Sequence, residues 1–202
     1  PVFGRDGAFE DRVWTNTGSD NAGFAVVERR GDCSLQSTRA GDEGQDVRIE
    51  AEIRVRGHAD GPLSEGGPFF RSRPAAAGDG IAGGTSAGFW VQLQSTGQVR
   101  VVRLHPFAVI ASTKPLPAFD TEKFHPLVLE ARGEWLGVWL DGQKLDFEQE
   151  GERRGRVRLA PLWEKTAPAG ENRGALGAAF SCSQNRGAVT GQQIRAFRWT
   201  RL

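Results

Sequence analysis

The sequence predicts an all-β protein, built as a two-sheet antiparallel β-sandwich that spans residues 1–202 as a single domain. Apolar and polar residues alternate with a period of two in most apolar segments, as they do in strands that bury one face. Gly and Pro are frequent, with 27 and 10 copies, and they mark turns between those segments. About a dozen short strands joined by turns are typical of a sandwich.

The clearest strand runs from Asp46 to Arg56. Its apolar and charged side chains fall on opposite faces, because successive residues of a strand point to opposite sides. One face carries Val47, Ile49, Ala51, Ile53 and Val55, and the other carries Arg48, Glu50, Glu52, Arg54 and Arg56. The simplest interpretation of the charged face is a solvated surface.

Two hairpins follow in the middle of the chain. Residues 88–93 return as residues 98–104 after the turn at 95–97, and residues 124–132 return after Gly133-Glu134 as a strand that ends at Asp141-Gly142. Further strands are expected at residues 24–28, 33–37, 67–71, 155–159, 174–181 and 193–202. Residues 73–87 and 163–173 are crowded with Pro, Gly and Ala, and we expect long loops there.

The strand after Gly133 contains two tryptophans. Leu136, Val138 and Leu140 share one face, so Trp135 and Trp139 share the other, roughly 13 Å apart along the strand. Flat aromatic rings on an open sheet face suit the apolar faces of sugar rings. The alternative is that a loop or a second layer covers both rings, because large aromatic side chains are more often packed than displayed.

Composition limits the partners of the chain. Lys and Arg number 26 and Asp and Glu 25, for a formal net charge of +1, and this balance predicts no nucleic-acid partner. No run approaches the ~20 apolar residues of a membrane helix, so no membrane partner is expected. The chain begins Pro1-Val2-Phe3 without a signal peptide or an initiating Met. We therefore expect a processed product or part of a longer chain.

Cys33 and Cys182 are the two cysteines. A disulfide between them would close a loop of about 150 residues and contribute roughly 5 kcal/mol in the chain-entropy model. It would also favour an oxidising compartment. Two buried free thiols are the equal alternative.

A series of short motifs resembles one family of sandwich domains. The motifs are Phe9-Glu10-Asp11 with Trp14, the strand from Asp46 to Val55, residues 65–72, residues 88–93, residues 135–142 and residues 193–199. In this order they resemble the concanavalin A-like lectin/glucanase sandwich (a jelly roll), and most of all its 3-keto-disaccharide hydrolase-type domains. The resemblance implies a saccharide ligand on the concave sheet. Trp90 stands where that family usually has Glu, which removes a proton-transfer group and adds a stacking surface.

The register of this family implies six ligand-binding side chains on the non-core faces of strands. Indoles stack on sugar rings, while Arg and Gln side chains donate hydrogen bonds to hydroxyls. A small number of polar groups that converge on an aromatic floor is typical of small-ligand sites. The alternative is that some of the strands belong to the convex sheet, so that the residues never meet. The six are Arg71, Trp90, Gln92, Gln94, Trp135 and Trp139.

Acidic residues supply weaker candidates for catalysis and for calcium binding. Glu50 and Glu52 lie about 6.6 Å apart along one strand face, a spacing suited to the carboxyl pair of a glycosidase. Both alternate with arginines, however, and a solvated, salt-bridged strand face is the favoured explanation. Many sandwiches of this class carry a structural calcium between the first and last strands, which makes Glu10 and Asp11 candidate ligands. No other cofactor is expected.

Three functional hypotheses follow. The first is a carbohydrate-binding β-sandwich module of a secreted or periplasmic saccharide-degrading protein, with an oligosaccharide or polysaccharide as its partner. The second is a glycoside hydrolase-type enzyme of the same fold. The third is a structural or adhesion module without sugar binding, because a fold does not by itself determine a function.

Overall fold

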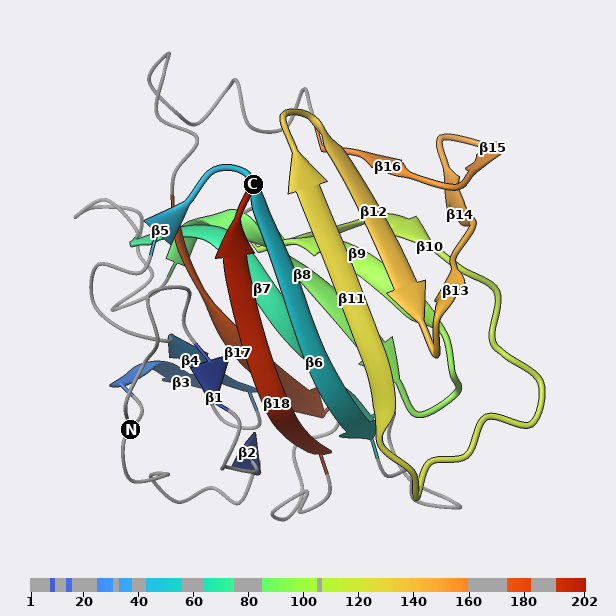
Figure 1. Ribbon diagram of the computed structural model, residues 1–202, viewed down its shortest axis with the longest axis horizontal. Helices are drawn as coiled ribbons and strands as arrows, with labels where there is room; N and C mark the ends of the chain where they lie inside the picture. The colour runs from blue at the N-terminus through green and yellow to red at the C-terminus, as the bar shows by residue number, and fades with distance from the viewer. Residues whose placement is uncertain are drawn as a thin grey trace.

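The computed structural model of the chain is a sandwich of two antiparallel β-sheets, and its described residues contain no helix (Figure 1). This architecture confirms the predicted fold class. The structure describes residues 8–9, 14–15, 25–30, 33–37, 43–55, 64–74, 85–104, 107–159, 174–182 and 192–202.

The first sheet has eight strands in the described part of the chain. Its order is β1-β18-β6-β11-β12-β13, with β2 beside β18 and β16 beside β12. In Figure 1 this sheet lies in front, and β18, β6, β11 and β12 run side by side. Its strands are β1 (Ala8–Phe9), β2 (Trp14–Thr15), β6 (Val47–Val55), β11 (His125–Arg132), β12 (Trp135–Leu140), β13 (Gln143–Lys144), β16 (Val157–Arg158) and β18 (Gln192–Arg201).

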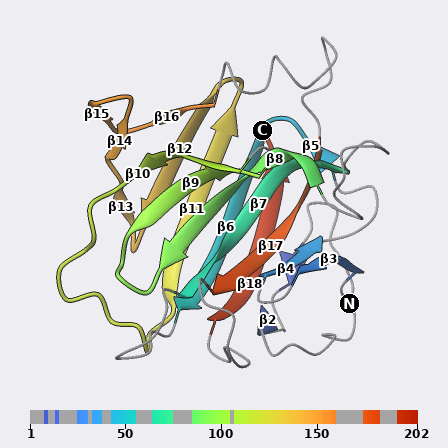
Figure 2. The ribbon, with the colours of Figure 1, turned by 180° about the vertical axis from the view of Figure 1, so that it is seen from behind.

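The second sheet has ten described strands. Its order is β15-β14-β10-β9-β8-β7-β17-β4-β3, with β5 beside β17. Figure 2 views the molecule from this side, with β7, β8 and β9 across the centre. Its strands are β3 (Ala25–Arg30), β4 (Cys33–Ser37), β5 (Glu43–Gly44), β7 (Ser64–Pro74), β8 (Thr85–Gln94), β9 (Val99–Arg103), β10 (Ala108–Ser112), β14 (Phe147–Gln149), β15 (Glu152–Arg154) and β17 (Gly174–Cys182).

The main hydrophobic core lies between the two sheets. Along β6 every second side chain is buried, so its apolar set faces the core as the alternation predicts. Val91 and Leu93 of β8 and Leu136 and Val138 of β12 enter the same core from the two sheets. Each sheet therefore keeps one inner and one outer face, and a functional side chain must lie on one of the two outer faces or at an edge.

Strand β10 is the main described element that the sequence did not predict. Residues 107–111 form a nearly continuous apolar run without alternation. The register between β10 and β9 shifts between Val109 and Ala111, and a bulge of this kind breaks the period-two pattern. The predicted loop at residues 73–87 is also shorter than expected, because β7 continues to Pro74 and β8 begins at Thr85.

Candidate functional site

The six predicted ligand-binding residues do not share one face of the sandwich. Trp90, Gln92 and Gln94 lie on β8 of the ten-stranded sheet, whereas Trp135 and Trp139 lie on β12 of the eight-stranded sheet. The residues between them on both strands line the common core. The two groups therefore point to opposite outer faces, and a single site built from all six is ruled out by the topology.

The two tryptophans of β12 are half-buried, and each lies beside a cation. The Arg156 guanidinium lies 3.9 Å from the centre of the Trp135 ring, and the Lys144 ammonium lies 5.6 Å from that of Trp139. The Trp139 ring also covers Gly137, where an added Cβ would lie 2.9 Å from the Cη2 atom of the indole. These contacts occupy ring surface that an open stacking platform would present.

Arg71 cross-links the two sheets instead of facing the outer surface. It is 2% exposed, and its Nε donates a hydrogen bond to the Gln45 carbonyl oxygen at 2.7 Å. A second guanidinium nitrogen lies 3.3 Å from Oδ1 of Asp46, which also accepts from the Gly133 N–H at 2.9 Å. Burial lowers the pKa of Arg71, while the Asp46 charge acts in the opposite direction. Arg71 thus ties β7 to the start of β6 and to the β11–β12 turn.

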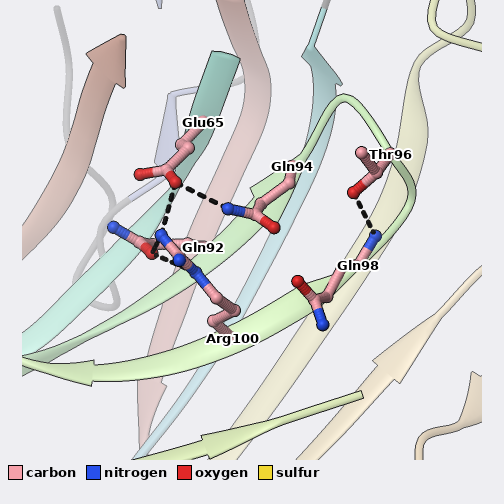
Figure 3. A network of polar contacts seen from close by, with 6 residues as sticks. All are labelled: Glu65, Gln92, Gln94, Thr96, Gln98 and Arg100. Carbon is pink, nitrogen blue, oxygen red and sulfur yellow. Dashed lines mark hydrogen bonds and ion pairs between the residues drawn. The ribbon is translucent and has the colours of Figure 1, made fainter. Parts of the chain in front are cut away.

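A polar cluster lies on the outer face of the ten-stranded sheet, formed by Glu65, Gln92, Gln94 and Arg100 of β7, β8 and β9 (Figure 3). Nε2 of Gln94 donates to Oε1 of Glu65 at 2.6 Å, and Arg100 forms an ion pair with the same oxygen. Arg100 also donates from two nitrogens to Oε1 of Gln92, at 3.1 and 2.8 Å. The cross-strand pairs Glu65 with Gln94 and Gln92 with Arg100 bring the four together.

Gln92 leaves one hydrogen-bond donor unused. The residue is 0% exposed, and its Nε2 has no partner among the described residues. The orientation of the amide is set by Arg100, because a guanidinium only donates and must face the oxygen. In Figure 3 the amide nitrogen points away from Arg100, below the Glu65 carboxylate. A buried donor without a partner costs free energy, so this nitrogen is the unsatisfied point of the cluster.

An apolar row lies beside the polar cluster on the same outer face. The register pairs Phe69 with Trp90, Trp90 with Val102 and Val102 with Val109, across β7, β8, β9 and β10. Phe69, Trp90 and Val102 form a small hydrophobic cluster separate from the main core. Trp90 is 3% exposed, and its Nε1 donates to the Gly67 carbonyl oxygen at 3.1 Å. Trp90 is therefore a packed member of this row instead of an open stacking surface.

Glu65 and Arg100 were absent from the residues predicted from the sequence. The signal for Arg100 was present, because the 95–97 turn sets the β8–β9 register and with it the pair between Gln92 and Arg100. Glu65 had no such signal. Residues 75–84, which connect β7 to β8, are too many for a tight turn, so sequence alone does not define the β7–β8 register.

The predicted catalytic candidates lie in ion pairs on the other outer face. Glu50 accepts from Arg48 at 2.7 Å, and Glu52 accepts from Arg195 at 2.6 Å. The hydrogen bond from Arg48 to Glu50, and to a smaller extent the one to Glu130, raises the pKa of Arg48. This arrangement favours the salt-bridged strand face, and it separates both glutamates from the polar cluster by the thickness of the sandwich.

The described residues contain no group of three or more His, Cys, Asp or Glu side chains that could hold a metal ion. The calcium candidates Glu10 and Asp11 lie outside the described residues. Cys33 and Cys182 lie on the neighbouring strands β4 and β17, with side chains outside the described set. Within the described part of the chain, no helix has the length and apolar character needed to cross a membrane.

The solved structures that resemble this chain over nearly its whole length include two Bacillus subtilis proteins. A carbohydrate-binding module, CBM66 from Bacillus subtilis, aligns with a TM-score of 0.53 and 16% identity, covering 95% of this chain and 96% of the module. A Bacillus subtilis protein of unknown function with a galectin-like fold aligns with a TM-score of 0.52 and 10% identity, covering 94% and 88%. At these identities the likeness shows the sandwich fold. No family model and no curated protein matches the sequence.

Proposed function

We propose that this protein is a saccharide-binding module, and that its polar cluster on the ten-stranded sheet holds the sugar. The proposal includes the expectation that the module serves an exported saccharide-degrading protein. The observation that carries the site assignment is the buried, unpartnered amide nitrogen of Gln92, whose amide oxygen shares Arg100 with the Glu65 carboxylate. The sandwich fold, which the chain shares with a carbohydrate-binding module, supports the choice of ligand class.

The chemistry of the polar cluster suits a hydroxyl group. A sugar hydroxyl both accepts and donates a hydrogen bond, so one hydroxyl accepts from Nε2 of Gln92 while its proton, or that of a neighbouring hydroxyl, goes to the Glu65 carboxylate. Hydrogen bonds with a charged partner are the stronger kind. In the apolar row beside the cluster, Val109 is 45% exposed and offers carbon surface to the C–H face of the ring, whereas Phe69, Trp90 and Val102 are buried. Polar groups of this kind beside an apolar floor are typical of small-ligand sites.

The same cluster gives less support to hydrolysis. A glycosidase uses two carboxyl groups roughly 5 to 9.5 Å apart, and the polar cluster contains one, that of Glu65. Oε1 of Glu65 is also engaged by Gln94 and Arg100 through direct contacts. Binding without bond cleavage is therefore the function that this geometry favours.

Gln92→Glu tests the site by removing one donor. The new carboxylate keeps an oxygen for Arg100 but offers no N–H, so we expect affinity for a bound saccharide to fall about 10- to 100-fold, the effect of leaving one hydrogen bond unmade. Isothermal titration calorimetry measures the change, with cello-, xylo-, laminari-, manno- and fructo-oligosaccharides of one to six residues as probes. Each mixture is also analysed for released products.

Two further variants make this result specific. Glu65→Gln keeps the shape of the cluster and is expected to weaken binding as well, because a neutral amide is the weaker acceptor. Gln143→Glu adds the same charge at an exposed position of the eight-stranded sheet, and it is expected to bind like the parent. If Gln92→Glu binds saccharide as tightly as the parent, the polar cluster is not the binding site. If the parent protein binds none of the probes, saccharide binding is rejected.

Trp139→Ala distinguishes the two outer faces. Because Trp139 lies on the eight-stranded sheet, across the core from the polar cluster, we expect saccharide affinity within about twofold of the parent, a difference below about 0.5 kcal/mol. The same calorimetric titration measures it. A loss of tenfold or more in a folded Trp139→Ala protein would instead move the site to the tryptophan strand.

A further inference from the structure

We infer that the binding face extends across the strands from the polar cluster to Phe107 and Val109, and that it takes a neutral oligosaccharide longer than one residue. This inference rests on the proposed function and deepens it by assigning a second, apolar subsite. The observation behind it is the cross-strand row that joins the buried Trp90 and Val102 to the exposed Val109.

Exposure increases along this face in one direction. In the apolar row, Trp90 and Val102 are buried, whereas Val109 is 45% exposed, and Phe107, directly before β10, is 64% exposed. In the polar cluster, Gln92 is fully buried, while the Arg100 side chain on the next strand is 23% exposed. The face is therefore buried at β8 and open at β10, so an oligosaccharide that reaches the Gln92 amide enters from the β10 side and also contacts that side.

The described apolar residues on this open side are well placed to contact such a ligand. Phe107 lies in the turn that directly precedes β10, two residues before Val109, and both side chains are exposed. Leu104, in the turn that follows β9, packs against the Trp90 cluster. An exposed phenylalanine beside a site of polar hydroxyl-binding groups suits the apolar face of a second sugar ring.

The distance between the polar cluster and the exposed apolar residues at β10 is larger than one sugar residue. Neighbouring strands lie about 4.8 Å apart and residues advance about 3.3 Å along a strand, so Val109 is roughly 12 Å from Gln92. One monosaccharide cannot cover that distance, whereas an oligosaccharide can. The ligand is neutral because the carboxylate of the polar cluster repels an acidic sugar, and its guanidinium is already paired with that carboxylate and with Gln92.

Chain-length dependence in parent and Phe107→Ala proteins tests the inference. For the probe series that binds the parent, affinity is expected to rise with length from one to about four residues, as contact area accumulates. Phe107→Ala is expected to weaken the longer oligosaccharides about 5- to 10-fold and to leave the monosaccharide unchanged, while Phe107→Trp preserves the gain. Leu202→Ala removes an exposed apolar side chain (44%, against 64% for Phe107) directly after β18 of the other sheet and serves as the control.

The outcomes separate this inference from the proposed function. If Phe107→Ala binds every length like the parent while Gln92→Glu weakens binding, the second subsite is wrong and the polar cluster stands. If no probe binds the parent, both fail. A parent dimer that Phe107→Ala converts to a monomer, without a change in oligosaccharide affinity, would make this surface a contact between two copies and overturn the subsite. Acidic oligosaccharides that bind at least as tightly as neutral ones would overturn the stated ligand class.

Discussion

Gly67→Ala is expected to lower the free energy of unfolding by about 3 kcal/mol, at the upper end of the usual cost of overpacking. A Cβ at residue 67 would lie 1.9 Å from the Val91 carbonyl oxygen, which is far inside van der Waals contact. The obstacle is backbone, so β7 and β8 must move apart to accept the methyl group. For a chain of this length the change corresponds to a fall in melting temperature of roughly 6 to 12 °C, which calorimetry or circular dichroism measures.

The same substitution also tests the proposed site. Gly67 lies on β7 between Glu65 and Phe69, and its carbonyl oxygen accepts the Trp90 indole N–H. Separating β7 from β8 would move Glu65 away from Gln94 and disturb the apolar row. We therefore expect saccharide affinity to fall with stability, even at a temperature where the variant is folded.

Gly155→Ala is the control for this prediction. A Cβ there meets no atom closer than 3.5 Å, which is ordinary contact, so stability is expected to change by less than about 0.5 kcal/mol. A Gly67→Ala protein as stable as Gly155→Ala would show that the two strands accommodate the methyl group, and the close approach would then have no energetic importance.

Arg71→Met is expected to destabilise the sandwich by about 2 to 3 kcal/mol. Removing one partner of a buried ion pair usually costs 3 to 5 kcal/mol, and the half-exposed Asp46 side chain reduces that value because water can solvate it. The Gln45 carbonyl oxygen also loses its donor. Methionine keeps much of the aliphatic volume, so the effect reports the lost polar contacts. Chemical denaturation with urea measures the free energy of unfolding.

Arg158→Met supplies the matched comparison. Arg158 forms an ion pair with Glu134 at 3.2 Å, and both side chains are exposed. Exposed pairs contribute little, so a change of about 0.5 kcal/mol or less is expected. Equal effects of the two substitutions would mean that Arg71 does not act as a cross-link between the sheets. Saccharide affinity of folded Arg71→Met is expected to match the parent, because Arg71 faces the eight-stranded sheet and not the polar cluster.

Most of the strands could be predicted from the sequence, because period-two alternation is a local property. The expected strand at residues 46–56 corresponds to β6, and the two predicted hairpins correspond to β8–β9 and β11–β12. Residues 33–37 match β4. Strand β10 was missed because a bulge removes the alternation there. The apolar positions of β6, β8 and β12 were assigned to the core for the same local reason, and the structure confirms them.

The candidate site could be predicted only in part. Gln92 and Gln94 were selected from the polar face of their strand, and they do lie together with Arg100 and Glu65. Trp135 and Trp139 were selected by the same pattern, yet they lie on the opposite outer face. Arg71 was selected from a motif, yet the backbone at this residue has a φ of 52° and its side chain turns toward the other sheet.

The sequence by itself determined the strands, their inner faces and the all-β class, since each follows from residues close together in the chain. The tertiary structure alone decided which outer face each strand contributes to. In a sandwich both sheets bury one face in the same core, so a polar outer residue has the same local pattern in either sheet. Pairing between distant segments, such as β7 with β17 and β6 with β18, removes that ambiguity. It is this pairing that brings the polar cluster together and separates it from the tryptophan strand.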